Sequence, residues 1–409
     1  MVRIHLPEYP SVDCDEIVIG SGLSALGVVL GLSASSRVLV ICGPRSPLTQ
    51  FYLPGRTVPC ARLGLGGLGS FWHGVIPAFV DPRFEGVGEE DFRTLFAQFY
   101  ADDVARYYGR PYLFVPWRPV RPARFLSRLQ SSRPSLTLVN TRAQHVIPGA
   151  AGVEVVTGEG TLSARRVWLC AGALHTPPLI ADFPGVTARA TVSDHVLCYL
   201  GQLHRSALPQ DAPLDLRRTR SGMWIRASRH PSGRALVNLR PARFDYRRLD
   251  SGIAQRAAFG LPTNSAVGKV LAGASPGLLA EALYNRAGLF PRAGVYSVYA
   301  QVHVPDAHWH AGGDNPVRLR SEVICAATDT IRCELPWPGV IPSRRPDMFI
   351  PMIHLHHTLD LEALRHAGVN SPESRLQIAD ASVIEDIGSE HHSFRMMVAA
   401  FARARALAA

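Results

Sequence analysis

Two groups of histidines near the carboxyl end of the sequence carry side chains suited to acid–base chemistry. The segment IHLHHTLDL contains His354, His356 and His357, and the segment SEHHSF contains His391 and His392. Because an imidazole has an unperturbed pKa of about 6.5, it can exchange a proton near neutral pH. Two alternatives stay open. In the first, His354 and His391 are only buried, hydrogen-bonded residues. In the second, His354, His356 and His391 ligate a metal ion, since His-x-His is a usable spacing. With no carboxylate pair or thiol nearby, we expect no metal.

The elements that position such residues begin with the amino-terminal stretch CDEIVIGSGLSALGVVLGLSASSRVLVICG. Its pattern predicts strands at 16–19 and 37–41 with a helix at 23–32 between them. Gly20 would allow a tight turn, and Gly22 would let the backbone approach a pyrophosphate at the helix N-terminus. The pattern favours a dinucleotide site over a glycine turn without a ligand. The contacting residues would be Gly20, Ser21, Gly22, Leu23 and Ser24.

Two further positions refine this dinucleotide site. Ala25 and Gly27 are expected to keep the helix tight against the sheet. The acidic residue that commonly ends the second strand and binds the ribose is absent, because Cys42 stands there. Its absence weakens the case for an exchanging nicotinamide more than the case for a buried flavin.

Four more segments follow in order: LGGLGSFWHG at 65–74, RRVWLCAGALHTPPLI at 165–180, VSDHV at 192–196, and LQIADASVIEDIGSEHHSFRMMVAAFARARAL at 376–407. Together with the first motif, they resemble the glucose-methanol-choline (GMC) family of flavin oxidoreductases in a shortened form, with pyranose-oxidase-like features. The resemblance implies an α/β fold (α+β overall). It would combine a Rossmann-like FAD-binding domain with a smaller antiparallel-sheet substrate domain.

The resemblance also implies a set of FAD contacts. His145 and Val146 would contact adenine, Ala171 and Gly172 the ribose region, and His392 the flavin. Phe71 stands where some relatives attach FAD through a histidine, so non-covalent FAD is expected, with His73 as a reservation. The implied cofactor residues beyond the first turn are Cys42, Gly67, Ser70, Phe71, His145, Val146, Ala171, Gly172, Asp380, Ala381, Ser382, His392 and Ser393.

Catalysis would use the histidines. Alcohol oxidation moves a hydride to flavin N5 and needs a base for the hydroxyl proton. By resemblance, His354 is that base, and His391 hydrogen-bonds the substrate oxygen while His392 faces the flavin. On strand geometry, His354 and His356 would share a face, with His357 pointing oppositely. His357 replaces a glycine of the family, which favours the alternative of a non-redox lyase or cyclase using the same histidines.

The chain divides into an FAD-binding part (1–194), a substrate or cap part (195–350) and a return to the FAD-binding part (351–409). The middle part is expected to form antiparallel strands, with helices near 250–259 and 276–286. It is shorter than usual for the family. An open pocket for a bulky or carrier-tethered substrate would follow.

Composition narrows the setting. With 47% hydrophobic and 19% charged residues, the chain is that of a globular protein. The net charge of +10 comes almost entirely from arginine, which is typical of a GC-rich bacterial genome. The basic clusters lack aromatics, so we expect no nucleic-acid partner. We expect a small-molecule substrate, either a sugar or a secondary metabolite. The basic charge also allows an anionic substrate.

Neither export nor membrane insertion is indicated, because no long apolar run or signal-like start is present. The seven scattered cysteines are read as reduced thiols in a cytoplasm. Substrate identity, electron acceptor and oligomeric state are not predicted.

Overall fold

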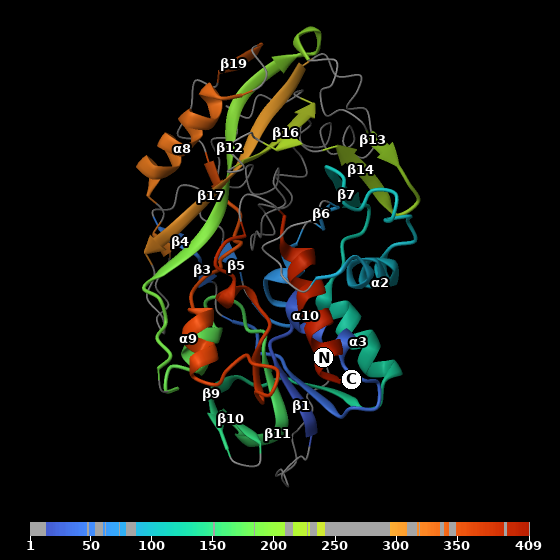
Figure 1. The fold of residues 1–409 in the computed structure, drawn as a ribbon, viewed down its shortest axis with the longest axis vertical. Coiled ribbons are helices and arrows are strands. Elements are labelled where there is room, and N and C mark those ends of the chain that lie inside the picture. Colours follow the sequence, from blue (N-terminus) through green and yellow to red (C-terminus); the bar gives the residue numbers. More distant parts are fainter. Residues whose placement is uncertain are drawn as a thin grey trace.

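The structure is a computed structural model (Figure 1). It describes residues 14–46, 49–53, 60–61, 63–72, 74–78, 87–149, 152–183, 185–208, 216–226, 228–229, 235–241, 295–308, 317–318, 320–335, 339–342, 349–387 and 391–408. His73 and the helices expected near 250–259 and 276–286 lie outside these ranges.

The helices are α1 (Leu23–Gly31), α2 (Glu89–Phe99), α3 (Pro122–Ser132), α4 (Thr176–Leu179), α8 (Ser321–Cys333), α9 (Leu361–His366) and α10 (Ser393–Ala408), with 3-10 turns η1 (Gly67–Phe71), η2 (Arg205–Ala207) and η5 (Ala381–Val383). The strands are β1 (Cys14–Ile19), β2 (Val38–Ile41), β3 (Thr49–Gln50), β4 (Tyr52–Leu53), β5 (Cys60–Ala61), β6 (Ile76–Pro77), β7 (Tyr112–Pro116), β8 (Leu136–Val139), β9 (Ala143–Pro148), β10 (Val153–Thr157), β11 (Gly160–Leu169), β12 (Thr191–His204), β13 (Leu216–Arg218), β14 (Gly222–Arg226), β15 (Ser228–Arg229), β16 (Ala235–Pro241), β17 (Val295–His308), β18 (Val317–Arg318), β19 (Val340–Pro342), β20 (Phe349–Pro351) and β21 (Leu376–Ile378).

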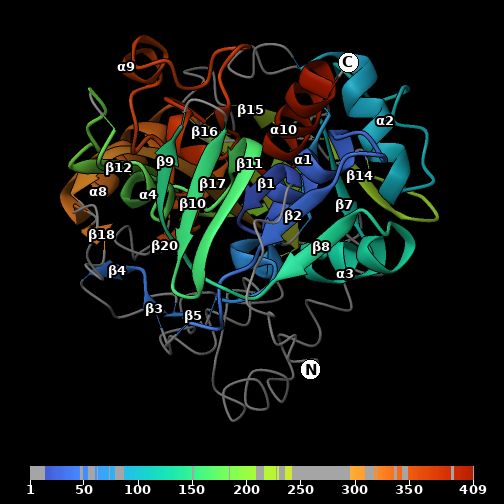
Figure 2. The same ribbon diagram turned by 90° about the horizontal axis from the view of Figure 1, so that it is seen from below.

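A mostly parallel sheet forms the first layer. Its order is β8-β2-β1-β11-β10-β9 (Figure 2). Strand β21 also pairs with β11. Strands β8, β2, β1, β11 and β21 run parallel, whereas β10 and β9 form an antiparallel extension. The apolar strands β1 and β2 are buried, as expected for strands covered on both faces. The expected Rossmann-like strand, helix and strand are confirmed.

Helix α10 packs directly on α1. A Cβ atom at Gly27 would lie 2.2 Å from the carbonyl oxygen of Met397, and one at Gly31 would lie 2.4 Å from that of Phe401. Gly27 therefore allows close packing between two helices. The expectation that it faces the sheet was wrong, because the partner helix comes from the far end of the chain.

The same contacts fix the relative direction of the two helices. Position 27 faces 397 and position 31 faces 401, so α1 and α10 run parallel in register. Extending the register by one turn brings Ser393 level with Leu23. Both helix N-termini therefore lie at the carboxyl end of β1, just after which α1 begins.

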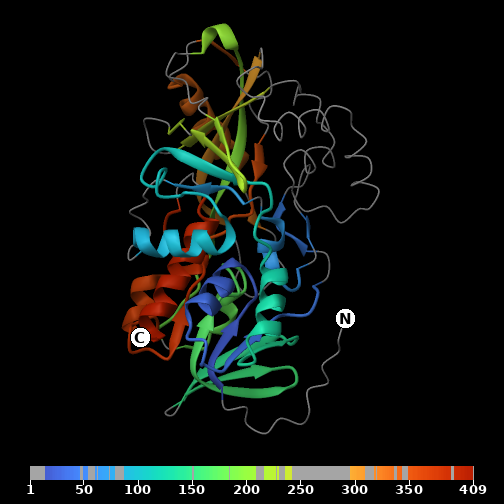
Figure 3. The same ribbon diagram turned by 90° about the vertical axis from the view of Figure 1, so that its right-hand side faces the viewer.

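An antiparallel sheet forms the second layer, above the first in Figure 3. The fourteen-residue strands β12 and β17 pair at its centre, and its main order is β15-β16-β17-β12-β19. A separate sheet, β13-β14-β7-β6, takes strands from both sides of residue 194. The expected α/β fold with an antiparallel second sheet is confirmed. The predicted boundary between the FAD-binding part and the cap part, at 194/195, falls inside strand β12. The division into these parts stays a prediction.

The segment that carries His354 is irregular. After β20 ends at Pro351, its strand-like pairing is limited to isolated bridges at His356 and Leu359. Ile353 and His357 have φ angles of 60° and 58°, in the left-handed region. The strand alternation expected for these histidines was wrong, because two left-handed residues turn the backbone around the segment 354–356.

By the sequence resemblance, His357 stands in place of a glycine, and its φ of 58° is a conformation that glycine adopts readily. Glycine adopts positive φ without the steric cost that a Cβ atom brings. We expect His357→Gly to be more stable than His357→Ala by about 0.5–1 kcal/mol. Ala363→Gly inside α9 serves as the control and should destabilise the protein. Denaturant unfolding measures both differences in the free energy of unfolding. A His357→Ala variant as stable as His357→Gly would show that the positive φ at position 357 causes no strain.

Candidate active site

Predicted cofactor residues from four separate segments lie at one edge of the parallel sheet. Gly20 follows β1, Cys42 follows β2, Ala171 lies two residues beyond β11, and Asp380 lies two residues beyond β21. Because these strands are parallel, their carboxyl ends meet at one edge. That edge is where open α/β sheets bind their ligands.

The two glycines of the first turn have different surroundings. Gly20 has φ 116°, and a Cβ atom there would lie 2.2 Å from the carbonyl oxygen of Cys170. A Cβ atom at Gly22 would meet only the carbonyl oxygen of Gly66, at 4.0 Å. The chain itself therefore requires Gly20, whereas Gly22 borders open space at the N-terminus of α1. Such a space suits a phosphate group.

A serine ties this turn to the second glycine-rich segment. Ser21 is buried, and its hydroxyl oxygen accepts a hydrogen bond from the N–H of Gly66 at 2.9 Å. Leu23 and Ser24 are half-buried at the start of α1. Phe71 ends η1, which begins directly after Gly66. The first turn and the glycine-rich loop thus form one surface.

A cavity of about 460 Å³ lies beside this surface, at the carboxyl ends of β2 and β8. Three of the predicted residues line it: Cys42, Gly67 and Ser70. No role was predicted for its other lining residues, which are Gly43, Arg45, Gly64, Leu65, Leu138, Val139 and Asn140. The apolar run Leu136–Val139 is the signal that could have identified β8 as a neighbour of β2.

Cys42 offers no charge to this cavity. Burial raises the pKa of its thiol to about 12, although a side-chain hydrogen bond with Ser21 opposes the shift. Arg45 is the charged side chain among the lining residues. A ligand here would meet a guanidinium in place of the usual carboxylate.

Asp380 serves the chain itself. Its carboxylate accepts four hydrogen bonds, from the N–H of Gly172 (2.8 Å), the hydroxyl of Thr176 (2.5 Å), and the N–H (3.0 Å) and hydroxyl (2.6 Å) of Ser382. Ala381 starts η5, and its carbonyl oxygen accepts the N–H of His357 at 3.0 Å. Any cofactor contact by Asp380 would therefore use its backbone.

His145 and Val146 lie elsewhere. They belong to β9, at the opposite end of the sheet from β8. His145 is exposed, with its Nδ1 3.3 Å from a carboxylate oxygen of Asp182, and Val146 is buried. The structure does not bring them to the cavity, and their adenine contact stays a prediction.

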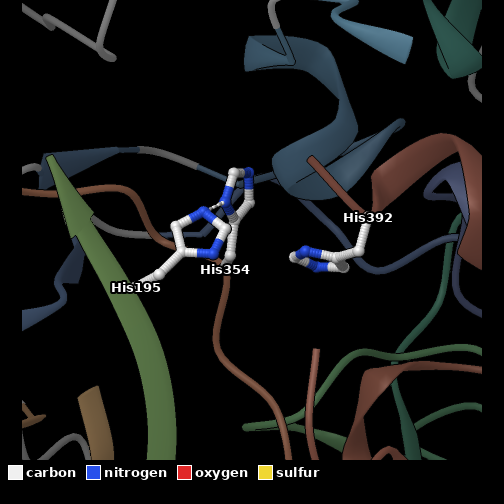
Figure 4. A group of neighbouring side chains, drawn as sticks. All are labelled: His195, His354 and His392. Carbon is white, nitrogen blue, oxygen red and sulfur yellow. Dashed lines mark hydrogen bonds between the residues drawn. The ribbon is translucent and has the colours of Figure 1, made fainter. Parts of the chain in front are cut away.

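Three histidines from distant segments converge beside the N-terminus of α10. His195 comes from β12, His354 from the turn after β20, and His392 directly precedes α10 (Figure 4). Their ring centroids lie 4.3 Å apart for His195 and His354, 4.8 Å for His354 and His392, and 5.7 Å for His195 and His392. One nitrogen from each ring lies within 4.8 Å of the others.

The sequence pointed to His354 and His392 but gave His195 no role. The Asp-His pair within VSDHV was the available signal. His391 was expected beside the substrate and His392 beside the flavin. His391 is half-buried, and His392 is the one of the two in the cluster, where its carbonyl oxygen accepts the N–H of Met396 at 2.9 Å. Ser393 is the first residue of α10.

Asp194 links two of the three segments. Its Oδ1 accepts the backbone N–H of His195 at 2.7 Å and that of His354 at 2.8 Å. The N–H of Met352 also donates to the carbonyl oxygen of His195 at 3.1 Å. The fully buried Asp194 therefore fixes the backbone beneath both rings.

Burial keeps two histidines neutral. It lowers the pKa of His195 well below 6.5, and the neighbouring His354 and His392 lower it further. Burial likewise lowers the pKa of His356 to about 3, against the opposing hydrogen bond between its Nδ1 and the carbonyl oxygen of His354 (2.9 Å). Both rings therefore act at neutral pH as uncharged groups.

These shifts predict a loss of stability in acid. Below pH 6.5 the unfolded chain protonates His195 and His356, whereas the folded protein keeps them neutral. The stability they contribute is complete above pH 6.5 and falls as pH falls towards the folded pKa. At pH 5, His356 is expected to lower the free energy of unfolding by about 2 kcal/mol, and His195 adds to the loss. Urea unfolding at pH 7 and pH 5 measures the change.

His356→Gln provides the comparison for this measurement. Its amide can still donate to the carbonyl oxygen of His354, but it does not titrate. The variant should therefore lose about 2 kcal/mol less than the parent between these two pH values. An equal loss in both proteins would show that His356 is not the source.

The described residues also bear on two other expectations. Within the described ranges, six cysteines form no disulfide, namely Cys14, Cys42, Cys170, Cys198, Cys325 and Cys333. Among the helices within the described ranges, none has the length and apolar character needed to cross a membrane.

Solved structures share this fold. A pyridoxine 4-oxidase from Mesorbium loti matches 96% of this chain and 99% of its own, at 16% identity and a TM-score of 0.51. A formate oxidase matches 98% of both chains, at 14% identity and a TM-score of 0.51. At these identities the likeness shows the fold alone, and the fold implied by the sequence resemblance is confirmed. The sequence matches no protein-family model and no curated protein.

Proposed function

We propose that the protein is an FAD-dependent oxidoreductase that oxidises an alcohol of a small molecule. One observation carries the proposal: three imidazoles from separate segments converge at the N-terminus of α10. The register of α1 and α10 places that terminus beside the open N-terminus of α1. The chain also shares its fold with a pyridoxine 4-oxidase and a formate oxidase, which are oxidases by name.

The residues at the sheet edge fit FAD. Gly22 leaves room for a pyrophosphate at the N-terminus of α1, and Arg45 borders a cavity large enough for a nucleoside. The N-terminus of α10 would offer partial positive charge to the pyrimidine ring of a bound flavin. When bound, FAD would supply the hydride acceptor. Phe71 supports non-covalent attachment.

The histidines would then handle the proton. His354 takes the hydroxyl proton of the alcohol, and a second imidazole hydrogen-bonds the same oxygen. The sequence assigned that second role to His391. The ring beside His354 is that of His392, with 4.8 Å between the centroids. We therefore assign the hydrogen bond to the substrate oxygen to His392.

Anaerobic mixing with a panel of sugars and other alcohols tests this function. Bleaching of the flavin absorbance by an alcohol is the expected result. A product formed while the flavin stays oxidised would favour the non-redox lyase or cyclase. That alternative was motivated by His357, which the structure places in the left-handed conformation that glycine adopts.

A transition-metal ion is the second candidate for the same imidazoles, because three ring nitrogens within 4.8 Å of one another can act as ligands. Metal analysis of the purified protein separates the two. One tightly held zinc, copper or cobalt ion per chain, lost in a His195→Ala variant, would support the metal site. If the purified protein oxidises alcohols but contains no such ion, the metal site is excluded.

A further inference from the structure

We propose that His195 is a positioning residue that accepts a hydrogen bond from Nδ1–H of His354, so that Nε2 of His354 carries no proton and can take one from the alcohol. The inference rests on the proposed function, which makes His354 the base. It assigns a role to a residue that the sequence left without one. It also specifies which nitrogen of the base reacts.

The contacts of His195 define its tautomer. Nε2 of His195 forms a hydrogen bond with Nδ1 of His354, and Nε2 of Gln301 lies 2.7 Å from the same His195 nitrogen. The NH₂ group of an amide only donates. With the amide nitrogen of Gln301 facing His195, as in the structure, Nε2 of His195 accepts and is unprotonated, so its single proton lies on Nδ1.

The tautomer of His354 follows. Its Nδ1 faces an unprotonated nitrogen of His195, so the hydrogen bond between them requires the proton on Nδ1 of His354. A neutral imidazole carries one N–H, so Nε2 of His354 then carries no proton. The two donors, from Gln301 and His354, share one lone pair of His195.

The surroundings keep His195 uncharged. Its side chain is fully buried and Gln301 is 1% exposed. The titratable groups around it are His354, His392, His391 and His356, and each would repel a proton on His195. Asp194, the adjacent carboxylate, binds the backbone N–H groups of His195 and His354 through Oδ1. His195 therefore orients the base as a neutral acceptor, without placing a negative charge beside it.

The backbone holds this pair in place. Asp194 fixes the main chain beneath both rings. Ile353 and His357, both with positive φ, bound the turn that carries His354. Positions over-determined in this way are common at functional sites, where they limit the rotation of the reacting group.

Nitrogen-15 NMR of the full-length protein with labelled histidines tests the proposal without a substrate. In the parent protein, His354 is expected with the proton on Nδ1 and with Nε2 unprotonated. His195→Leu removes the acceptor and should abolish this state, whereas His195→Gln presents an amide oxygen and should preserve it. His354→Gln identifies the resonance. A parent protein with His354 protonated on Nε2 would overturn the proposal.

Kinetics of the FAD-loaded protein give the second readout. Flavin reduction by an alcohol should slow at least roughly 10-fold in His195→Leu and recover most of its rate in His195→Gln, with FAD still bound in both. Equal rates in His195→Leu and the parent would overturn the proposal. If no alcohol reduces the flavin, the function fails while the NMR result still decides the tautomer. If His195→Leu does not fold, the parent spectrum and His195→Gln decide it.

Discussion

Replacing His354 by alanine is expected to slow flavin reduction by an alcohol at least ~10²-fold. The variant loses the imidazole that takes the hydroxyl proton, while the α1 turn and the cavity at Cys42 remain intact. FAD binding should therefore stay close to that of the parent. Anaerobic stopped-flow at saturating alcohol measures the chemical step directly.

An exposed histidine provides the matched control for this variant. His366 lies at the end of α9 and is exposed to solvent. His366→Ala should reduce its flavin at the parental rate. A His354→Ala variant that does the same would remove His354 from the role of base, and His392 would become the next residue to test.

Replacing Gly22 by alanine is expected to weaken FAD binding on the order of 10- to 10²-fold, because the added methyl group occupies the space in front of the α1 N-terminus. Within the protein this methyl group meets only the carbonyl oxygen of Gly66, at 4.0 Å. The stability of the FAD-free protein should therefore change little. Fluorescence titration with FAD and denaturant unfolding give the two quantities.

Gly20 serves as the comparison, because its replacement by alanine should lower the stability of the protein itself. At Gly20, a Cβ atom would lie 2.2 Å from the carbonyl oxygen of Cys170, and φ is 116°. Gly20→Ala should therefore destabilise the protein even without FAD. If Gly22→Ala binds FAD as tightly as the parent, the pyrophosphate does not lie at this turn.

Local patterns in the sequence predicted the local parts of the fold. The strand, turn and helix around Gly20 follow from apolar periodicity and glycine spacing, and β1 and α1 begin within two residues of the expected positions. The two histidine segments were identifiable because each carries a concentrated motif. Such features depend on neighbours in the chain.

Contacts between segments far apart in the chain could not be predicted from local sequence patterns. The cavity beside Arg45 exists because β8 pairs with β2, about a hundred residues earlier, and Gly27 proved to face α10. His195 joined the site through pairing of β12 with the segment around His356. Nothing local distinguishes a lone Asp-His pair in a strand from a surface feature.

The error at His356 and His357 has a different cause. Strand alternation assumes extended backbone at every residue. Ile353 and His357 both take the left-handed conformation, although neither is glycine. Tertiary contacts, including the hydrogen bond from the N–H of His357 to Ala381, hold a conformation that residue type alone does not indicate.

Equilibrium binding of FAD to the purified, full-length protein tests the central claim most directly. We expect one FAD per chain, with a flavin spectrum perturbed by the protein, and full release of the flavin into solution when the protein is denatured. A protein that stays colourless after incubation with FAD would contradict the account of the sheet edge and of the histidines beside it.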